Sequence, residues 1–131
     1  MPQKVFRVQI YTREYEKLRN YYENILSLPL VTLRETSESD RVRVYAAASG
    51  EIELIHAPAE MEFPESNGWT VQIEVDDADA YCKEILENGG TVKRGPADQP
   101  WGHRNFKVLD PSGLELTFYS LIEKPKGSNI K

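Results

Sequence analysis

KVFRVQIY at Lys4–Tyr11 and WTVQIEV at Trp69–Val75 are the two segments that decide the fold. Both alternate apolar and polar residues with the period of a half-buried strand. Both also contain the triplet Val-Gln-Ile, which begins at Val8 and returns 63 residues later at Val71. A strand that recurs at a fixed offset is typical of an internal repeat. The repeat therefore predicts the same order of elements after each segment.

The residues after the first segment predict one helix and three strands. Apolar positions recur at near-helical spacing, with Thr12 as a candidate N-cap and Pro29 ending the helix: Tyr15, Leu18, Tyr22 and Ile25. Strands are expected over 30–36, 41–48 and 51–56, with turns at 37–40 and 49–50. Unit one, residues 4–57, is thus predicted to be a βαβββ unit.

The same order returns after a linker at 58–68 that is rich in proline and glutamate. A helix is expected to begin at Asp76 or Asp77 and to end at Asn88-Gly89-Gly90. Further strands are expected over 91–94, 102–109 and 114–121, with a loop at 95–100 and a turn at 110–113. Unit two then covers 69–121, and the tail 122–131 is expected to be mobile. The predicted fold is α+β, with two βαβββ units whose curved mixed sheets enclose a cleft and carry the helices outside.

Composition narrows the classes of partner. A chain of 131 residues fits one domain, and no apolar run approaches the ~18 residues of a membrane span, so we expect neither a leader nor a membrane partner. The single cysteine, Cys82, falls on the apolar stripe of its helix and indicates a reducing, cytoplasmic compartment. The net charge of −5 disfavours nucleic acid as a partner.

Three motifs carry a resemblance to a known family. They are Tyr21-Tyr22 followed by Ile25–Pro29, Val75–Ala80 followed by Asn88-Gly89-Gly90, and Pro100–Phe106 followed by Asp110–Gly113. Together with the paired units they resemble the vicinal oxygen chelate superfamily over residues 4–120, in particular its glyoxalase and bleomycin-resistance-type members. The resemblance implies one domain of this type over 1–131 and a homodimer.

Catalytic members of that superfamily hold a divalent metal through His or Glu side chains on the first and last strand of each unit. In this sequence the resemblance places Arg7, Glu53, Thr70 and either Glu115 or Thr117 at those positions. Arginine stays protonated and does not coordinate a metal. His56 has the opposite strand parity from Glu53, and His103 is assigned to the Trp-Gly loop. Both therefore fall outside the ligand positions, so we expect no metal cofactor.

The expected function is binding of a small organic molecule in the cleft. Alternation along the strands predicts that the following residues face the cleft: Arg7, Gln9, Tyr11, Arg43, Tyr45, Glu53, Gln72, Glu74, Glu115, Thr117 and Tyr119. Trp101 in the Pro-Trp-Gly loop and Trp69 next to the linker are expected to add aromatic rings for an organic ligand.

Two alternatives stay open. One is a metal-dependent lyase of glyoxalase I type that uses Glu53 and Glu115. The other is that the strand aromatics only fill the sheet while the charges form pairs such as Arg7 with Glu53.

Overall fold

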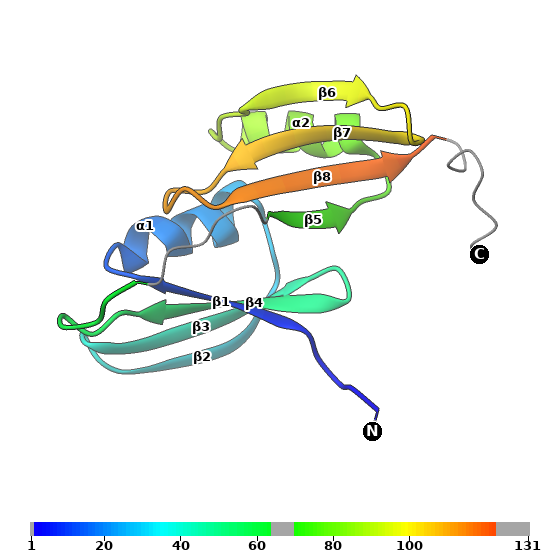
Figure 1. The fold of residues 1–131 in the computed structure, drawn as a ribbon. Helices are drawn as coiled ribbons and strands as arrows, with labels where there is room; N and C mark the ends of the chain where they lie inside the picture. The colour runs from blue at the N-terminus through cyan, green and yellow to red at the C-terminus, as the bar shows by residue number, and fades with distance from the viewer. Residues whose placement is uncertain (1, 64–69, 123–131) are drawn as a thin grey trace. The chain divides into compact units, whose positions relative to one another are not determined.

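The computed structural model describes residues 2–63 and 70–122, which fall into two compact units that divide between positions 69 and 70. Each unit holds one four-stranded mixed sheet and one helical segment in the order βαβββ (Figure 1). The α+β fold of two βαβββ units predicted from the sequence is confirmed. The predicted cleft concerns the placement of the units relative to one another and stays a prediction.

Unit one contains β1 (Arg7–Thr12), α1 (Tyr15–Asn20), the π-helical turn η1 (Tyr21–Ile25), β2 (Leu30–Ser37), β3 (Asp40–Ala47) and β4 (Gly50–His56). Its sheet has the order β1-β4-β3-β2, in which β1 runs parallel to β4 and the other pairs are antiparallel. Glu14, not Thr12, is the N-cap of α1. The Thr12 hydroxyl instead accepts a hydrogen bond from the Glu14 backbone N–H, which turns the chain from strand into helix.

Apolar side chains from the helical segment and the sheet form the core of unit one. Leu18, Tyr22, Tyr45 and Leu54 are completely buried, and the rings of Tyr22 and Tyr45 stack at 6.0 Å between centroids. This contact fixes η1 on the central part of the sheet.

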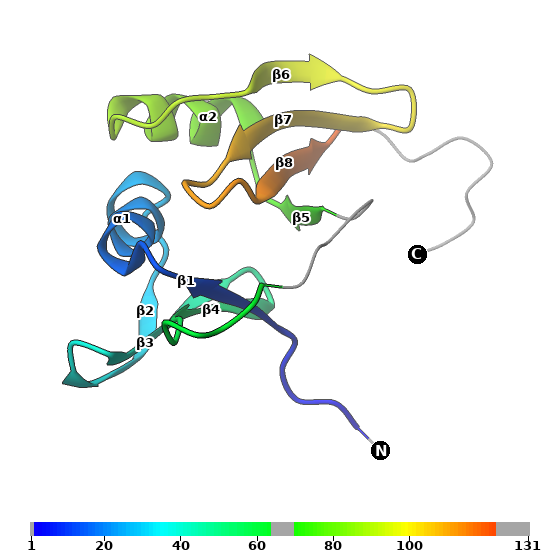
Figure 2. The same ribbon diagram turned by 60° about the vertical axis from the view of Figure 1, so that its left-hand side comes forward.

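Unit two contains β5 (Val71–Glu74), α2 (Ala78–Glu87), β6 (Arg94–Asp98), β7 (His103–Leu109) and β8 (Glu115–Leu121). The sheet order is β5-β8-β7-β6, and α2 packs against β6, β7 and β8 (Figure 2). Of the two caps that the sequence left open, Asp76 and Asp77, it is Asp77 that caps α2, by accepting from the Ala80 N–H. Gly89, with φ of +90°, ends the helix in the left-handed region.

The prediction for the sixth strand was wrong. The sequence favoured a strand over 91–94 and a loop over 95–100, whereas β6 spans Arg94–Asp98. Proline has no N–H to donate and normally stops a strand, but β6 lies at the sheet edge, where Pro96 is tolerated. The ladder also shifts register between Arg94 and Ala97.

Two predicted segments lie partly outside the described residues. Within the predicted linker, Arg13 donates to the carbonyl oxygens of Ala59 and Met61 and lies over the Phe63 ring, so this part belongs to unit one. Residues 64–69, which include Trp69, and 123–131 are not described. In the remainder of the chain, none of the helices is long and apolar enough to span a membrane.

Candidate functional site

Each sheet has one face that packs on the unit's own helix, the helix face, and one turned away from it, the distal face. The strand registers assign every residue to one of these faces, because cross-strand partners lie on the same side of a sheet. In unit one, Gln9 pairs in register with Glu53, and Glu53 with Val44. Tyr45 pairs with Ile52 and lies on the opposite side, the helix face.

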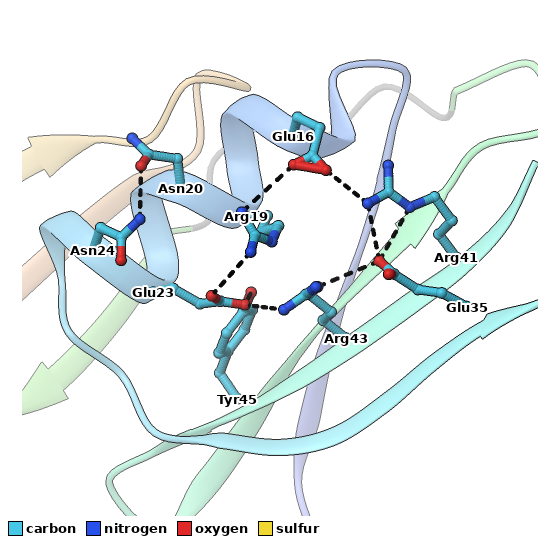
Figure 3. Close-up of polar contacts among 9 residues, drawn as sticks. All are labelled: Glu16, Arg19, Asn20, Glu23, Asn24, Glu35, Arg41, Arg43 and Tyr45. Carbon is cyan, nitrogen blue, oxygen red and sulfur yellow. Dashed lines mark hydrogen bonds and ion pairs between the residues drawn. The ribbon is translucent and has the colours of Figure 1, made fainter. Parts of the chain in front are cut away.

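The register therefore places Arg43 and Tyr45 on the helix face, and the sequence was wrong to group them with Glu53. Arg43 is only 8% exposed, and its guanidinium bonds Glu23 on η1 and Glu35 on β2 (Figure 3). The hydroxyl of Tyr45 donates to the same Glu23 carboxylate at 2.8 Å. These contacts hold the helical segment on β3 and take both side chains out of the candidate site.

Arg43 is part of a larger network of ion pairs on the helix face. Arg41 pairs with Glu16 on α1 at 2.6 Å and with Glu35 at 3.0 Å. Arg19 also lies within ion-pair distance of Glu16. Each of these carboxylates thus forms an ion pair with at least one arginine, and the network stabilises the packing of α1 and η1 on the sheet (Figure 3).

The distal face of unit one carries the remaining first-unit candidates. Gln9 donates from Nε2 to Glu53 at 2.8 Å. The Arg7 guanidinium pairs with Glu51 at 2.7 Å rather than with Glu53, so the ion pair suggested by the sequence was wrong in its partner. Tyr11 lies on the same face and is exposed.

On unit two the strand register groups the predicted residues on one face of the sheet. Gln72 pairs in register with Thr117, and Glu74 with Tyr119. Glu115 lies two residues before Thr117 and therefore shares its face. Phe106 and Phe118 lie on the helix face, where both rings contact Tyr81 of α2. The predicted residues alternate with them along the strands and therefore lie on the distal face.

A cluster of three rings lies at one end of this distal face. The imidazole of His103 stacks on the ring of Tyr119 at 4.0 Å between centroids and an angle of 7°. Trp101, which is 48% exposed, meets His103 edge-on at 6.2 Å. We call Trp101, His103 and Tyr119 the ring cluster. The Tyr119 hydroxyl donates to Glu74 at 3.4 Å, and the Nδ1 atom of His103 is buried without a hydrogen-bond partner among the described residues.

Sequence reasoning missed His103 because it assigned this residue to the Trp-Gly loop. The signal was present. Phe106 and Val108 are the buried apolar positions of β7, so strict alternation places Lys107, Asn105 and His103 on the opposite face.

Next to the ring cluster lies a polar group centred on Asn105, which is only 3% exposed. Its Oδ1 atom accepts hydrogen bonds from Arg94 and, at 3.2 Å, from Gln99. Asn105 is also the direct cross-strand partner of Tyr119. Rings and hydrogen-bonding groups thus adjoin on one face of one unit.

The residues at the superfamily's metal positions do not fit a divalent metal. Gln72 pairs with Thr117 as Gln9 pairs with Glu53, so the second unit has a hydroxyl where the first has a carboxylate. Glu115 instead lies 3.4 Å from both Lys93 and Lys107. Burial acts to raise the pKa of Glu115, but the two ammonium groups together have the larger effect, so the pKa lies below its usual value.

Those lysines also compete with a cation for the Glu115 carboxylate. In the part of the chain that is described, no three His, Cys, Asp or Glu side chains form a group able to hold a metal ion.

Comparison with known proteins establishes the family. The chain matches the Glyoxalase/Bleomycin resistance protein/Dioxygenase superfamily over residues 4–118 and belongs to it. A stretch of 55 residues is 40% identical to the anthracycline biosynthesis protein DnrV of Streptomyces peucetius; it covers 42% of this chain and 20% of DnrV. The match thus spans one fifth of that relative's length.

Solved structures show the same fold. TnmS3, described as an antibiotic binding protein from Streptomyces sp. CB03234, superposes with a TM-score of 0.72 at 23% identity, over 92% of this chain and 97% of TnmS3. TioX from Micromonospora sp. ML1 gives a TM-score of 0.74 at 16% identity, over 91% of this chain and 99% of TioX.

Proposed function

We propose that the chain binds a small organic molecule with a planar ring system on the distal face of unit two, without a metal. The single observation that carries this proposal is the ring cluster, in which two stacked rings and an exposed indole lie together beside buried hydrogen-bonding groups. Planar ligands stack on such rings, and a few convergent polar groups set their orientation.

The relatives support the same class of ligand. DnrV is a protein of anthracycline biosynthesis and TnmS3 binds an antibiotic. Both proteins are connected with natural products rather than with the substrates of central metabolism, and we propose that the ligand of this chain is a compound of that kind.

The test uses chelator-treated protein and two probes, metal-free bleomycin and an anthracycline. We expect at least one probe to raise the melting temperature and to bind in a calorimetric titration. Trp101→Ala should then raise the Kd by about tenfold, because stacking contributes ~1 kcal/mol beyond burial of area. Phe63→Ala, which removes another exposed ring, is the matched control and should leave the Kd unchanged.

Binding that requires added Ni²⁺, Zn²⁺, Mn²⁺ or Fe²⁺ would contradict the proposal. It would favour the alternative of a metal-dependent lyase that uses Glu53 and Glu115. A Trp101→Ala variant with unchanged affinity would place the ligand elsewhere.

We further propose that the protein is a cytoplasmic homodimer. In unit one β2 is an edge strand whose residues are exposed throughout, including the apolar Leu30, Val31 and Leu33. Exposed apolar edges are surfaces on which chains pair. A monomer by light scattering at micromolar concentration would exclude the dimer.

A further inference from the structure

The guanidinium of Arg94 bonds only neutral acceptors among the described residues. It donates to the carbonyl oxygens of Gly95 at 2.9 Å and Asn105 at 3.2 Å, and to Asn105 Oδ1. All three acceptors are neutral. Of the arginines in residues 2–63 and 70–122, only Arg13 and Arg94 have no carboxylate within ion-pair distance among those same residues. Arg94 therefore carries a charge that its described neighbours do not neutralise.

The position of Arg94 gives this charge a role. Asn105 accepts from Arg94 on one side and pairs in register with Tyr119 on the other, so it links the guanidinium to the ring cluster. Adjacent strands lie ~4.8 Å apart, which places the guanidinium on the order of 5–10 Å from the Tyr119 ring. A molecule with one or two fused rings spans this distance.

The charges are also arranged in a definite direction across the sheet. In the order β5-β8-β7-β6, Glu74 stands on β5 and bonds Tyr119 on β8, whereas Arg94 stands on β6 beyond Asn105 of β7. The face is therefore negative on the β5 side of the rings and positive on the β6 side. Lys107, the register partner of Arg94, adds a second cation on the β6 side, although it is shared with Glu115.

We infer that the ligand of unit two is a planar aromatic acid, whose rings contact His103 and Tyr119 and whose carboxylate or comparable oxyanion is bound by Arg94. Arginine presents a planar fork of N–H groups that matches a carboxylate, and such charge-assisted bonds are stronger than neutral ones. The inference rests on the proposed function and narrows it to one class of ligand. An aromatic amine, attracted by Glu74, is the opposite outcome.

The experiment compares three probes with the same ring and different charge: 2-naphthoate, 2-naphthamide and 2-naphthylmethylammonium. Each is titrated into chelator-treated wild-type protein at pH 7.5 and low salt. We expect 2-naphthoate to bind about tenfold more tightly than the neutral amide, and the ammonium probe to bind most weakly.

Variants assign the preference to Arg94. Arg94→Gln should abolish the advantage of 2-naphthoate over 2-naphthamide, and Arg94→Lys, which keeps the charge but loses the fork, should keep part of it. Lys83→Gln makes the same change of charge at an exposed position on α2 and should preserve the wild-type order. Circular dichroism of each variant checks that it is folded.

Equal affinities for the three probes, tighter binding of the ammonium probe, or an unchanged preference in folded Arg94→Gln would each overturn the inference. Absence of binding by all three would overturn it too. The proposed function has its own test in the antibiotic probes and Trp101→Ala, so a failure here leaves that result standing.

Discussion

Replacing Arg43 by methionine should destabilise the protein without weakening ligand binding. The sequence placed Arg43 among the ligand-binding residues, whereas the structure buries it on the helix face of unit one, bonded to Glu23 and Glu35. The variant tests which location is correct. Substituting a residue of the ligand site changes the Kd for the ligand, whereas substituting a residue of the ion-pair network changes the free energy of unfolding.

The expected size of the effect follows from what remains after the substitution. Removing one partner of a buried ion pair costs ~3–5 kcal/mol, because the other charge is left uncompensated. Here Glu23 keeps Arg19 at 3.8 Å and Glu35 keeps Arg41 at 3.0 Å, which reduces the loss. We expect a decrease of about 2 kcal/mol in the free energy of unfolding, or roughly 8 °C in melting temperature for a chain of this size.

Urea denaturation followed by circular dichroism measures this change, and a titration with 2-naphthoate well below the transition measures binding. Arg34→Met is the control, since Arg34 pairs with Asp40 at side-chain exposures of 57% and 41%. Exposed pairs of this kind contribute less than ~1 kcal/mol. The reasoning is refuted if Arg43→Met costs no more than Arg34→Met. It is refuted equally if Arg43→Met is stable and binds the probe less tightly.

Three further predictions concern acid stability, thiol reactivity and metal. Burial acts to raise the pKa of Glu35, but hydrogen bonds from Arg41 and Tyr15 and the charges of both Arg43 and Arg41 together lower this pKa below its usual value. The contribution of Glu35 to stability is therefore present above the unfolded pKa of ~4.3 and is lost as the pH falls through the folded pKa. Urea unfolding at pH 6 and pH 3 should therefore show a smaller loss in Glu35→Gln than in the wild type. Burial raises the pKa of Cys82, so its thiol should react slowly with Ellman's reagent in native protein and rapidly in denaturant; equal rates would contradict its burial. A chelator should leave the melting temperature of wild type and Glu53→Gln unchanged, whereas a fall in the wild type alone would indicate a bound metal.

Much of the fold follows from alternation along single strands. The strand beginning at Arg7 and its repeat at Val71 were predictable because each has one apolar face, and Asp77 was predictable as a cap because the helix after it has an apolar stripe. The sixth strand was not, because Pro96 and Gly95 normally break a strand and only its edge position allows them.

The faces of β3 show why part of the site could not be predicted. Val42 and Val44 are buried on one side of this strand, while Arg43 and Tyr45 are buried on the other. A strand covered on both sides gives no alternation of burial, so its facing depends on the register with β4, which the sequence of β3 alone does not contain. The carboxylate of Glu23, contributed by η1, is what allows an arginine on the helix face.

The two units have the same fold but differ in the side chains at equivalent positions. Gln9 and Gln72 occupy the same place in their sheets, yet their partners are Glu53 in unit one and Thr117 in unit two. A metal site that draws matching ligands from both repeats needs a coordinating side chain at each of these places, and a threonine hydroxyl is a poor ligand beside the Lys107 that pairs with it. Unit two carries the stacked rings of the ring cluster on its distal face, whereas the distal face of unit one carries Tyr11 beside the pairs Gln9–Glu53 and Arg7–Glu51. The proposed function therefore assigns the specific contacts with an organic ligand to unit two rather than to both repeats.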